Sequence, residues 1–447
     1  MSAPALAPPK YEIFQIVSPD GGNKVDLYEG QFRVISFDIF ENILSPFITG
    51  KVVISSSSGA ALDDKLNRST SLKSGLPLEV GCKILIRIKT QLGKTINYAV
   101  ENNDYMVLYV DKIFTILKDS TSESYALSFR TKVALENEQN RVTHRYNGNI
   151  ATSVQKIAEE YLKLDSSEIE VTPTSNEASF SGNQKRPLDL IIDMASRSTP
   201  ANTANPGYLC FETINKFNFV SFDKLITSEP QFTYKYNSGL VATEESKDDS
   251  NNFKVSSLQL VKDQDLLSQI RTGVYSSKSI FFNSLTYSFT EIDISVIDGK
   301  LTDDPKFSAL GNKYKTPSIL EKGFKESKKI HRINTKVIDI GAEKEKISKN
   351  DANNNPELYI AASNTRYNIM FSQALSVTVP CNTDLSAGST IKIIFEDVSS
   401  EKEKGPDQTR SGKYIVQALR HHFNGENSVT SMTLIRDSYG LHFTKTS

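Results

Sequence analysis

The chain has 447 residues, of which 23% are charged and 38% hydrophobic, a composition typical of a globular protein with roughly two to four domains. Its 52 basic and 53 acidic residues nearly cancel, so composition gives no support for a polyanion-binding surface, and we expect no sequence-specific nucleic acid as a partner. No apolar run approaches the roughly 18 residues of a membrane span, and residues 1–10 lack the basic start and apolar run of a signal peptide, so we expect no membrane partner.

The three cysteines, Cys82, Cys210 and Cys381, are far apart, odd in number and not arranged in CxxC pairs. This spacing argues against a disulfide framework and against a cysteine zinc site. We expect three buried, reduced thiols.

The N-terminal part is rich in strand signals. Residues 1–10 are a Pro/Ala-rich tail that we expect to be flexible. Runs of β-branched and aromatic residues then follow, separated by glycine and proline turns, which is typical of strands. The runs lie at residues 11–17, 34–39, 51–55, 83–88, 105–116 and 124–133. We therefore interpret residues 11–140 as the first antiparallel β-barrel.

The hydrophobic period changes after residue 140. Apolar residues at helical spacing predict a helix over residues 149–163, and Thr152 with Gln155 fits a capping box at its start. Pro187 favours the first turn of a second helix. Residues 207–222 read as a hairpin, so residues 141–236 form a small inserted α/β domain in this interpretation.

The remaining segments alternate between strand patterns and polar stretches. We assign residues 237–299 to a linker and to strands of a second barrel, and residues 300–369 to a polar helical or loop insertion. Residues 370–447 supply the remainder of the second barrel.

A weak internal repeat supports two similar barrels. Residues 78–86 and 385–393 both read L-x-x-G-x-x-I-x-I, with Gly81 and Gly388 at the turn. Each copy continues with a tyrosine-led strand, a polar turn and a strand holding an arginine, Arg130 or Arg436. The glycine-to-arginine separations are 49 and 48 positions. The fold class we predict is mainly β (α+β), with two antiparallel barrels and the inserted domains.

No catalytic pattern is found. Nucleotide-binding glycine loops, GxSxG, HExxH and EF-hand patterns are absent from the sequence. His421 and His422 would point to opposite faces of a strand, which does not suit one metal ion. We predict no catalytic residue, no cofactor and no metal, although a carboxylate pair for glycoside hydrolysis is left open, since its separation is not readable from sequence.

Four segments resemble one known family, at residues 40–50, 141–150, 207–223 and 433–438. They hold Glu41, Asn42, Pro46, Gly50, Tyr146, Phe211, Glu212, Arg436 and Asp437. These segments resemble the baseplate central hub proteins of myovirus-type contractile tails, especially of T-even-like phages and cyanophages, and the N-terminal hub part of VgrG-type spike proteins. With Gly81, Arg130 and Gly388 from the repeat, we regard these residues as a structural signature and not as a catalytic site.

The resemblance implies a fold and a role. The family has two tail-tube-like β-barrels with inserted domains, and forms a homotrimer that adapts the hexameric tail tube above to the trimeric cell-puncturing spike below. Tail tube protein, spike protein and baseplate wedge or tape-measure proteins are the partners it implies. The protein would be a structural component of the virion baseplate, assembled in the host cytoplasm.

Two alternatives belong to other functional classes. A receptor- or carbohydrate-binding tail-tip protein would expose stacking aromatic side chains at a distal tip, and the chain has no tryptophan. A cell-wall-degrading tail enzyme would need a cleft with converging titratable groups.

Overall fold

The computed structural model of the chain describes residues 6–28, 32–57, 61–63, 68–100, 103–119, 121–202, 205–236, 252–263, 265–283, 287–297, 308–311, 316–321, 329–338, 356–396 and 406–438. Among them, no helix is long and apolar enough to cross a membrane. Residues 1–5 of the expected N-terminal tail and most of the polar stretch 300–355 lie outside the described residues.

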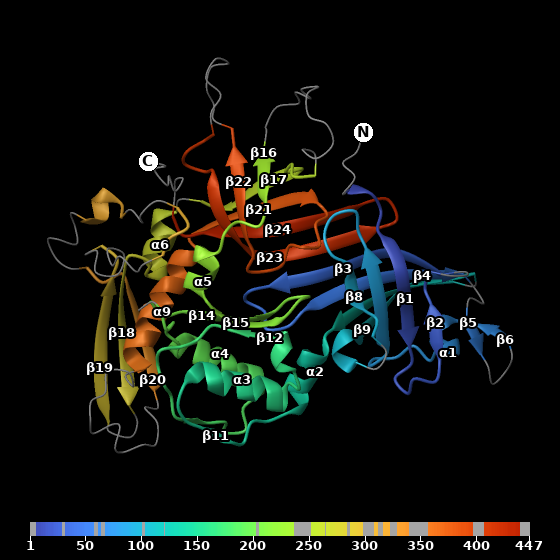
Figure 1. The fold of residues 1–447 in the computed structure, drawn as a ribbon, viewed down its shortest axis with the longest axis horizontal. Coiled ribbons are helices and arrows are strands. Elements are labelled where there is room, and N and C mark those ends of the chain that lie inside the picture. Colours follow the sequence, from blue (N-terminus) through green and yellow to red (C-terminus); the bar gives the residue numbers. More distant parts are fainter. Residues whose placement is uncertain are drawn as a thin grey trace, which may run out of the picture.

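The first half of the molecule is a curved antiparallel sheet around its own core (Figure 1). Its long strands alternate, so that Ile84, Ile86 and Ile88 of one strand all face inward and are fully buried. Its elements are β1 (Lys10–Val17), β2 (Lys24–Asp26), β3 (Phe32–Asn42), β4 (Thr49–Ser57), β5 (Ala61–Asp63), β6 (Arg68–Thr70), α1 (Leu72–Gly75), β7 (Lys83–Lys89), β8 (Ile96–Tyr98), η2 (Asp104–Met106), β9 (Leu108–Lys118) and β10 (Ser122–Arg130).

The second half repeats this plan around a second core. It comprises β16 (Thr233–Tyr236), β17 (Ser257–Lys262), β21 (Gln373–Pro380), β22 (Thr390–Phe395), β23 (Gly412–Asn424) and β24 (Ser428–Arg436). Its strand order, β17-β21-β24-β23-β22-β16, matches β3-β4-β10-β9-β7-β1 of the first half, except that β16 runs parallel to β22 whereas β1 runs antiparallel to β7.

One strand pair joins the two halves into a continuous 14-stranded sheet. Beyond its short pairing with β22, β23 pairs antiparallel with β3, from Ala418 opposite Asn42 to Asn424 opposite Ser36. The prediction of a mainly β fold with large antiparallel sheets is confirmed. Among the described strands, however, no pair closes either half into a barrel.

The repeat seen in the sequence corresponds to the same turn in both halves. Gly81 N–H donates to the Val110 carbonyl at 2.8 Å, and Gly388 N–H donates to the Val416 carbonyl at 2.8 Å. Both glycines have positive φ, +91° and +84°, which glycine adopts without steric cost. Each half also has a register shift directly after this valine, between β9 and β10 and between β23 and β24.

The arginine match in the repeat is wrong by one residue. Val110 lies opposite Phe129, and its counterpart Val416 lies opposite Leu434, so Arg130 corresponds to Ile435 and not to Arg436. The β9–β10 pair has a second register shift that the β23–β24 pair lacks. Because neighbouring strand residues face opposite ways, Arg130 is partly exposed while Arg436 is fully buried.

The inserted domain packs helices on a small sheet, β12-β15-β14. The two helices and the hairpin expected there are present, although the first helix is capped by Asn149, whose side chain accepts from Thr152 N–H, and not by Thr152 itself. The elements are α2 (Lys132–Gln139), β11 (Arg145–Tyr146), α3 (Ile150–Tyr161), η3 (Ser166–Glu168), β12 (Ile169–Val171), β13 (Phe180–Ser181), α4 (Pro187–Arg197), β14 (Tyr208–Glu212), β15 (Phe217–Ser221) and α5 (Phe222–Thr227).

A further unit differs from the expected domain plan. The strands at residues 276–295 were assigned to the second barrel, but they form a separate sheet, β19-β18-β20, against which α9 packs. Helix α9 lies at the end of the insertion that was expected to be helical or loop. The elements are α6 (Leu266–Thr272), β18 (Ser276–Asn283), β19 (Ser288–Ser295), β20 (Arg332–Ile338) and α9 (Pro356–Met370).

Candidate functional site

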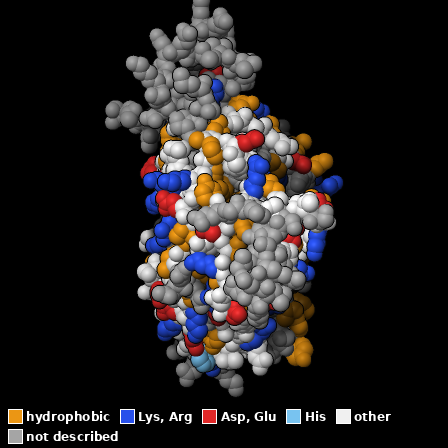
Figure 2. All heavy atoms as spheres, turned by 90° about the vertical axis from the view of Figure 1, so that its right-hand side faces the viewer, with side chains coloured by type: hydrophobic (Ala, Val, Ile, Leu, Met, Phe, Trp, Pro, Cys, Tyr) orange, Lys and Arg blue, Asp and Glu red, His pale blue; other side chains and the backbone are white. Residues whose placement is uncertain are grey.

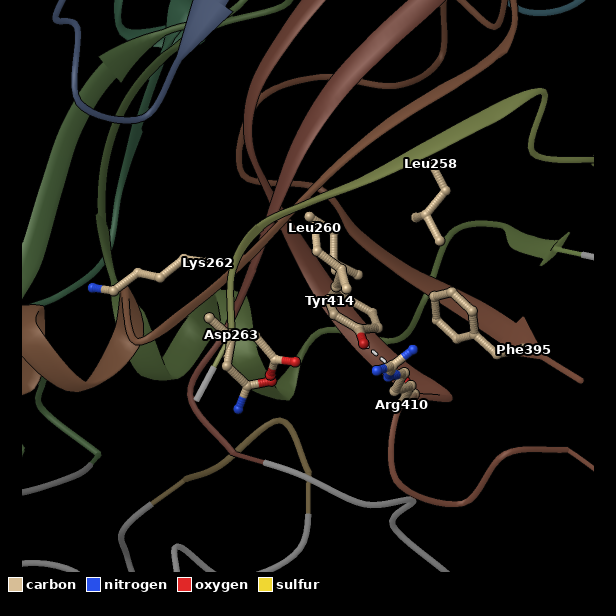
Figure 3. Close-up of a pocket in the computed structure, with 9 residues that line it drawn as sticks. Leu258, Leu260, Lys262, Asp263, Phe395, Arg410 and Tyr414 are labelled. Atoms are coloured by element: carbon tan, nitrogen blue, oxygen red, sulfur yellow. Dashed lines mark hydrogen bonds between the residues drawn. The ribbon is translucent and has the colours of Figure 1, made fainter. Parts of the chain in front are cut away.

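Small-molecule chemistry finds little support in the described residues. They contain no group of three or more His, Cys, Asp or Glu side chains able to hold a metal ion. The pocket drawn in Figure 3 lies beside β17 and has a volume of about 30 Å³, lined by Leu258, Leu260, Phe395 and Tyr414 among others. A cavity that binds a benzene ring has about 150 Å³, so this pocket is too small for a sugar ring.

A buried carboxylate, Glu41 at the end of β3, ties the first half to two other parts of the chain. Its Oε1 accepts from Ile214 N–H in the β14–β15 turn at 2.8 Å. Its Oε2 accepts from Ala387 N–H, next to the glycine turn of the second half, at 2.7 Å. One side chain therefore fixes both the inserted domain and the second half.

Glu212, at the end of β14, makes the converse connection. Its Oε2 accepts from Ile48 N–H at 2.9 Å and from the Thr131 hydroxyl at 2.5 Å, both in the first half. The two glutamates thus cross-link the first half and the inserted domain in opposite directions. We call Glu41, Glu212 and the backbone groups they bind the junction.

The junction carboxylates have raised pKa values, as catalytic carboxylates often have, but they are not accessible to a substrate. Burial raises the pKa of Glu41 to about 7, with a further upward contribution from the charge of Glu212, and burial also raises the pKa of Glu212. Such pairs mark candidate catalytic sites. Here Glu41 is only 1% exposed, and both of its oxygens are occupied by backbone N–H groups. The geometry therefore indicates that these carboxylates hold parts of the chain together.

Two signature glycines are required by close packing. A Cβ on Gly388 would lie 2.8 Å from Cζ of Phe211, so the glycine turn of the second half rests directly on the inserted domain. A Cβ on Gly50 would lie 2.1 Å from Cζ of Phe129 and 2.5 Å from the Asp38 carbonyl oxygen. Glu41, Phe211, Glu212 and Gly388 are thus the signature residues that the structure brings together.

The other signature residues lie in separate places. Asn42 accepts from Leu44 N–H and begins the β3–β4 loop that contains Pro46. The guanidinium of Arg130 lies 5.0 Å from the centre of the Phe47 ring and pairs with Asp111 at 2.9 Å. The Gly81 turn lies in the first half.

Three of them are core residues away from the junction. Tyr146 stacks on Phe180 within the inserted domain. Arg436 is buried, donates to the Ser411 carbonyl and lies 5.1 Å from the centre of the Tyr414 ring. Asp437 accepts from Leu310 N–H at 3.0 Å, and burial raises its pKa.

Sequence reasoning missed two polar clusters between elements. Asp223 of α5 and Arg366 of α9 form a buried ion pair. Asp38 on β3 accepts from Arg420 at 2.8 Å and contacts His422 Nδ1 at 2.7 Å, both on β23. Asp223 and Arg366 are 143 residues apart, and Asp38 and Arg420 are 382 residues apart. An isolated charge within a strand or helix pattern does not indicate so distant a partner.

The histidine and cysteine predictions can be compared with the structure directly. His421 is buried and hydrogen-bonds Thr430, whereas its neighbour His422 contacts Asp38, so the two face opposite ways as predicted. Burial lowers the pKa of His421 to about 4. All three cysteines are buried with no disulfide between them, as predicted.

Figure 2 shows the face of the molecule at the first half. Lys and Arg side chains are interspersed there with Asp and Glu, together with hydrophobic side chains. This face therefore has no extended region of one charge sign, in keeping with the composition.

Comparison with known proteins bears on the fold. No family model matches the sequence, and no curated protein does. Among solved structures, a tail protein from Neisseria meningitidis MC58 matches with a TM-score of 0.50 at 12% identity, covering 95% of this chain and 96% of that one. A tail protein of prophage MuSo2 from Shewanella oneidensis matches at 0.48 and 10%, with coverages of 95% and 98%. Prophage tail protein gp18 from Listeria monocytogenes EGD-e matches at 0.43 and 9%, with 96% and 95%.

The likeness to the Neisseria protein extends over almost the whole of both chains. At this identity it concerns the fold alone. The chain therefore has the fold of that tail protein.

Proposed function

We propose that the chain is a structural, non-catalytic component of a phage tail baseplate, a homotrimeric hub that adapts a sixfold tail tube to a threefold spike. The observation that carries this proposal is the duplication: one chain contains two halves of the same strand order, joined edge to edge through β3 and β23. The tail-protein fold supports a place in the tail.

The physical argument concerns symmetry. A sixfold ring offers six equivalent surfaces, and three single-sheet subunits would cover only half of them, leaving apolar area and strand edges exposed. Three copies of a duplicated chain present six near-equivalent halves. The inserted domain, present once per chain, keeps threefold symmetry for a spike.

The partners and location follow from this role. A tail tube protein would bind the side of the ring that the six halves form, and a trimeric spike would bind the opposite side. Wedge or tape-measure proteins would be further neighbours. The protein would reside in the virion baseplate after assembly in the host cytoplasm.

Electron microscopy of the purified assembly tests the proposal. We expect particles with threefold symmetry whose ring contains six similar lobes of density. Particles with six copies of the whole chain, or single-chain particles alone, would contradict it.

The binding and enzymatic alternatives lack a specific observation. The aromatic pairs seen in the described residues lie mostly within cores, such as Phe37 with Phe129. The junction carboxylates are occupied by the chain itself. We expect no release of soluble fragments when the protein is incubated with peptidoglycan or host polysaccharide, and turnover abolished by Glu41→Gln would contradict this.

A further inference from the structure

We propose that strand β17 of one copy pairs antiparallel with strand β9 of a second copy of this chain, repeating between copies the β3–β23 pairing found within the chain. The number of copies in the resulting ring rests on the proposed function. The pairing itself rests on the structures of β3, β23, β9 and β17.

The duplication makes β17 the counterpart of β3. Each is the edge strand next to the counterpart strands β21 and β4. Phe129 lies opposite Gly50 and its counterpart Leu434 lies opposite Leu375, so Leu375 corresponds to Gly50. Ile39 lies opposite Gly50, and Leu260 lies opposite Leu375. Leu260 therefore corresponds to Ile39.

The same comparison makes β9 the counterpart of β23. The hydrogen bonds of Val110 and Val416, and the register shift after each, align the two strands. Counting onward from that shift, Thr115 corresponds to His421.

Within the chain, β3 and β23 cover each other. His421 lies opposite Ile39, and Phe423 lies opposite Phe37 with their rings 6.2 Å apart. All four side chains are fully buried. The outer part of β23 thus completes the core of the first half.

The counterpart strands are open. Among the described strands, β17 has no neighbour on its outer edge, and β9 pairs with β7 only at Tyr109 and Leu108. Leu260 is 46% exposed where its counterpart Ile39 is 0% exposed. The outer part of β9 exposes Phe114, Ile116 and Leu117 by 56%, 58% and 51%.

Both open edges carry exposed apolar side chains. Apolar residues on an open strand edge are an unfavourable feature in a monomer, because they favour strand addition from another chain. Leu258 and Leu260 line the pocket of Figure 3, beside Phe395 and Tyr414. In the proposed register, Thr115 of a second copy lies opposite Leu260 beside that pocket, and Phe114 lies on the other face of the strand pair.

A cation–aromatic pair supports the same register. On β23, Arg420 lies opposite Phe40 and 5.8 Å from the centre of its ring. The counterpart of Arg420 is Phe114 on β9, and the counterpart of Phe40 is Lys262 on β17. The cation and the aromatic residue have therefore exchanged strands. The proposed pairing therefore brings an aromatic ring beside Lys262, whose ammonium donates to the Phe371 carbonyl at 3.0 Å within its own chain.

Disulfide trapping tests the pairing. In the variant Thr115→Cys/Leu260→Cys the two thiols lie opposite each other in neighbouring copies, and the native cysteines are buried. Mild oxidation of the full chain should give covalent dimers and trimers that disappear on reduction. The control Phe114→Cys/Leu260→Cys moves one thiol to the adjacent residue of the strand, on its other face, and should cross-link several-fold less.

The outcomes separate the inference from the proposed function. A trimer by mass that fails to cross-link overturns the β9–β17 pairing and leaves the proposed function standing. Covalent polymers longer than three copies support the pairing and overturn the threefold hub. A chain that stays monomeric before and after oxidation overturns both.

A single charge gives a second test. Leu260→Lys places an ammonium at the proposed interface, and the matched control Ile192→Lys changes a residue on α4 that is 45% exposed. Both sites are partly exposed, so we expect both variants to fold. The Leu260 variant should lose the trimer while the control keeps it, and equal assembly of the two would contradict the pairing.

Discussion

At the residue scale, the junction carboxylates combine burial with complete hydrogen bonding. Glu41 uses both oxygens to hold two loops, whereas Glu212 holds its two donors through Oε2 alone. This difference decides what an amide can replace. A glutamine side chain has one acceptor oxygen, so it can replace Oε2 of Glu212 but cannot replace both oxygens of Glu41.

We expect Glu41→Gln to destabilise the protein more than Glu212→Gln. The first variant sets an amide N–H₂ against a backbone N–H and loses one buried hydrogen bond, a cost of about 1–3 kcal/mol. The second keeps both of its bonds when the amide oxygen occupies the Oε2 position. Urea unfolding at about pH 5, where both wild-type carboxyls are largely protonated, measures the difference, and equal losses would contradict the assignment.

The pH dependence of stability provides a separate check. Because burial raises the pKa of Glu41 from 4.5 to about 7, the folded chain holds a proton that the unfolded chain releases. The resulting stability is present below pH 4.5 and is lost as the pH rises through about 7. We expect the melting temperature to fall over that range and to fall less in Glu41→Gln. An unchanged slope would refute the protonation of this carboxyl.

The two equivalent glycines should respond differently to alanine. Both have positive φ, which costs an L-residue about 1–2 kcal/mol. At Gly81 the added Cβ meets only Pro19 at 4.0 Å, whereas at Gly388 it meets Phe211 at 2.8 Å. We expect Gly388→Ala to lose about 1–3 kcal/mol more than Gly81→Ala, measured by urea unfolding. A larger loss at Gly81 would show that the turn of the second half does not rest on the inserted domain.

At the element scale, the sequence was sufficient to predict the helices and the hairpin whose residue patterns are local. The apolar spacing of residues 149–163 and the position of Pro187 correctly predicted α3 and α4, because a helix buries one face at a fixed period. The hairpin at residues 207–222 was found for the same kind of reason. Glu41, Phe211 and Glu212 were selected by resemblance, and only the fold shows why they belong together.

Pairing between distant strands could not be predicted. A strand pattern does not specify its sheet, so β18 and β19 were assigned to the wrong one. The arginine of the repeat was misaligned because a register shift in β9 has no sequence signature that we could identify. The β3–β23 pairing joins residues almost four hundred positions apart, with Asp38 and Arg420 at its centre.

A buried ion pair links helix α9 to α5. Removing one partner breaks a buried ion pair, which costs about 3–5 kcal/mol. We expect Arg366→Met to destabilise strongly and Asp223→Asn/Arg366→Met to recover part of the loss. A double-mutant cycle by thermal unfolding measures the coupling. A double variant as unstable as the sum of the single ones would contradict it.

At the scale of the whole molecule, duplication and asymmetry have separate roles. The two halves share a strand order, whereas among the described residues the inserted domain and the β18–β20 sheet occur once. Within one chain, the β3–β23 contact already shows how one half can dock on another. The proposed ring repeats this contact between copies.

The mass of the intact chain in solution tests this central claim most directly. Native mass spectrometry of the purified protein, repeated on the Leu260→Lys variant, reports the number of copies without assumptions about shape. The proposed hub predicts three times the mass of one chain for the wild type and a shift to single chains in the variant. A wild-type mass of one chain, or of six, would contradict it.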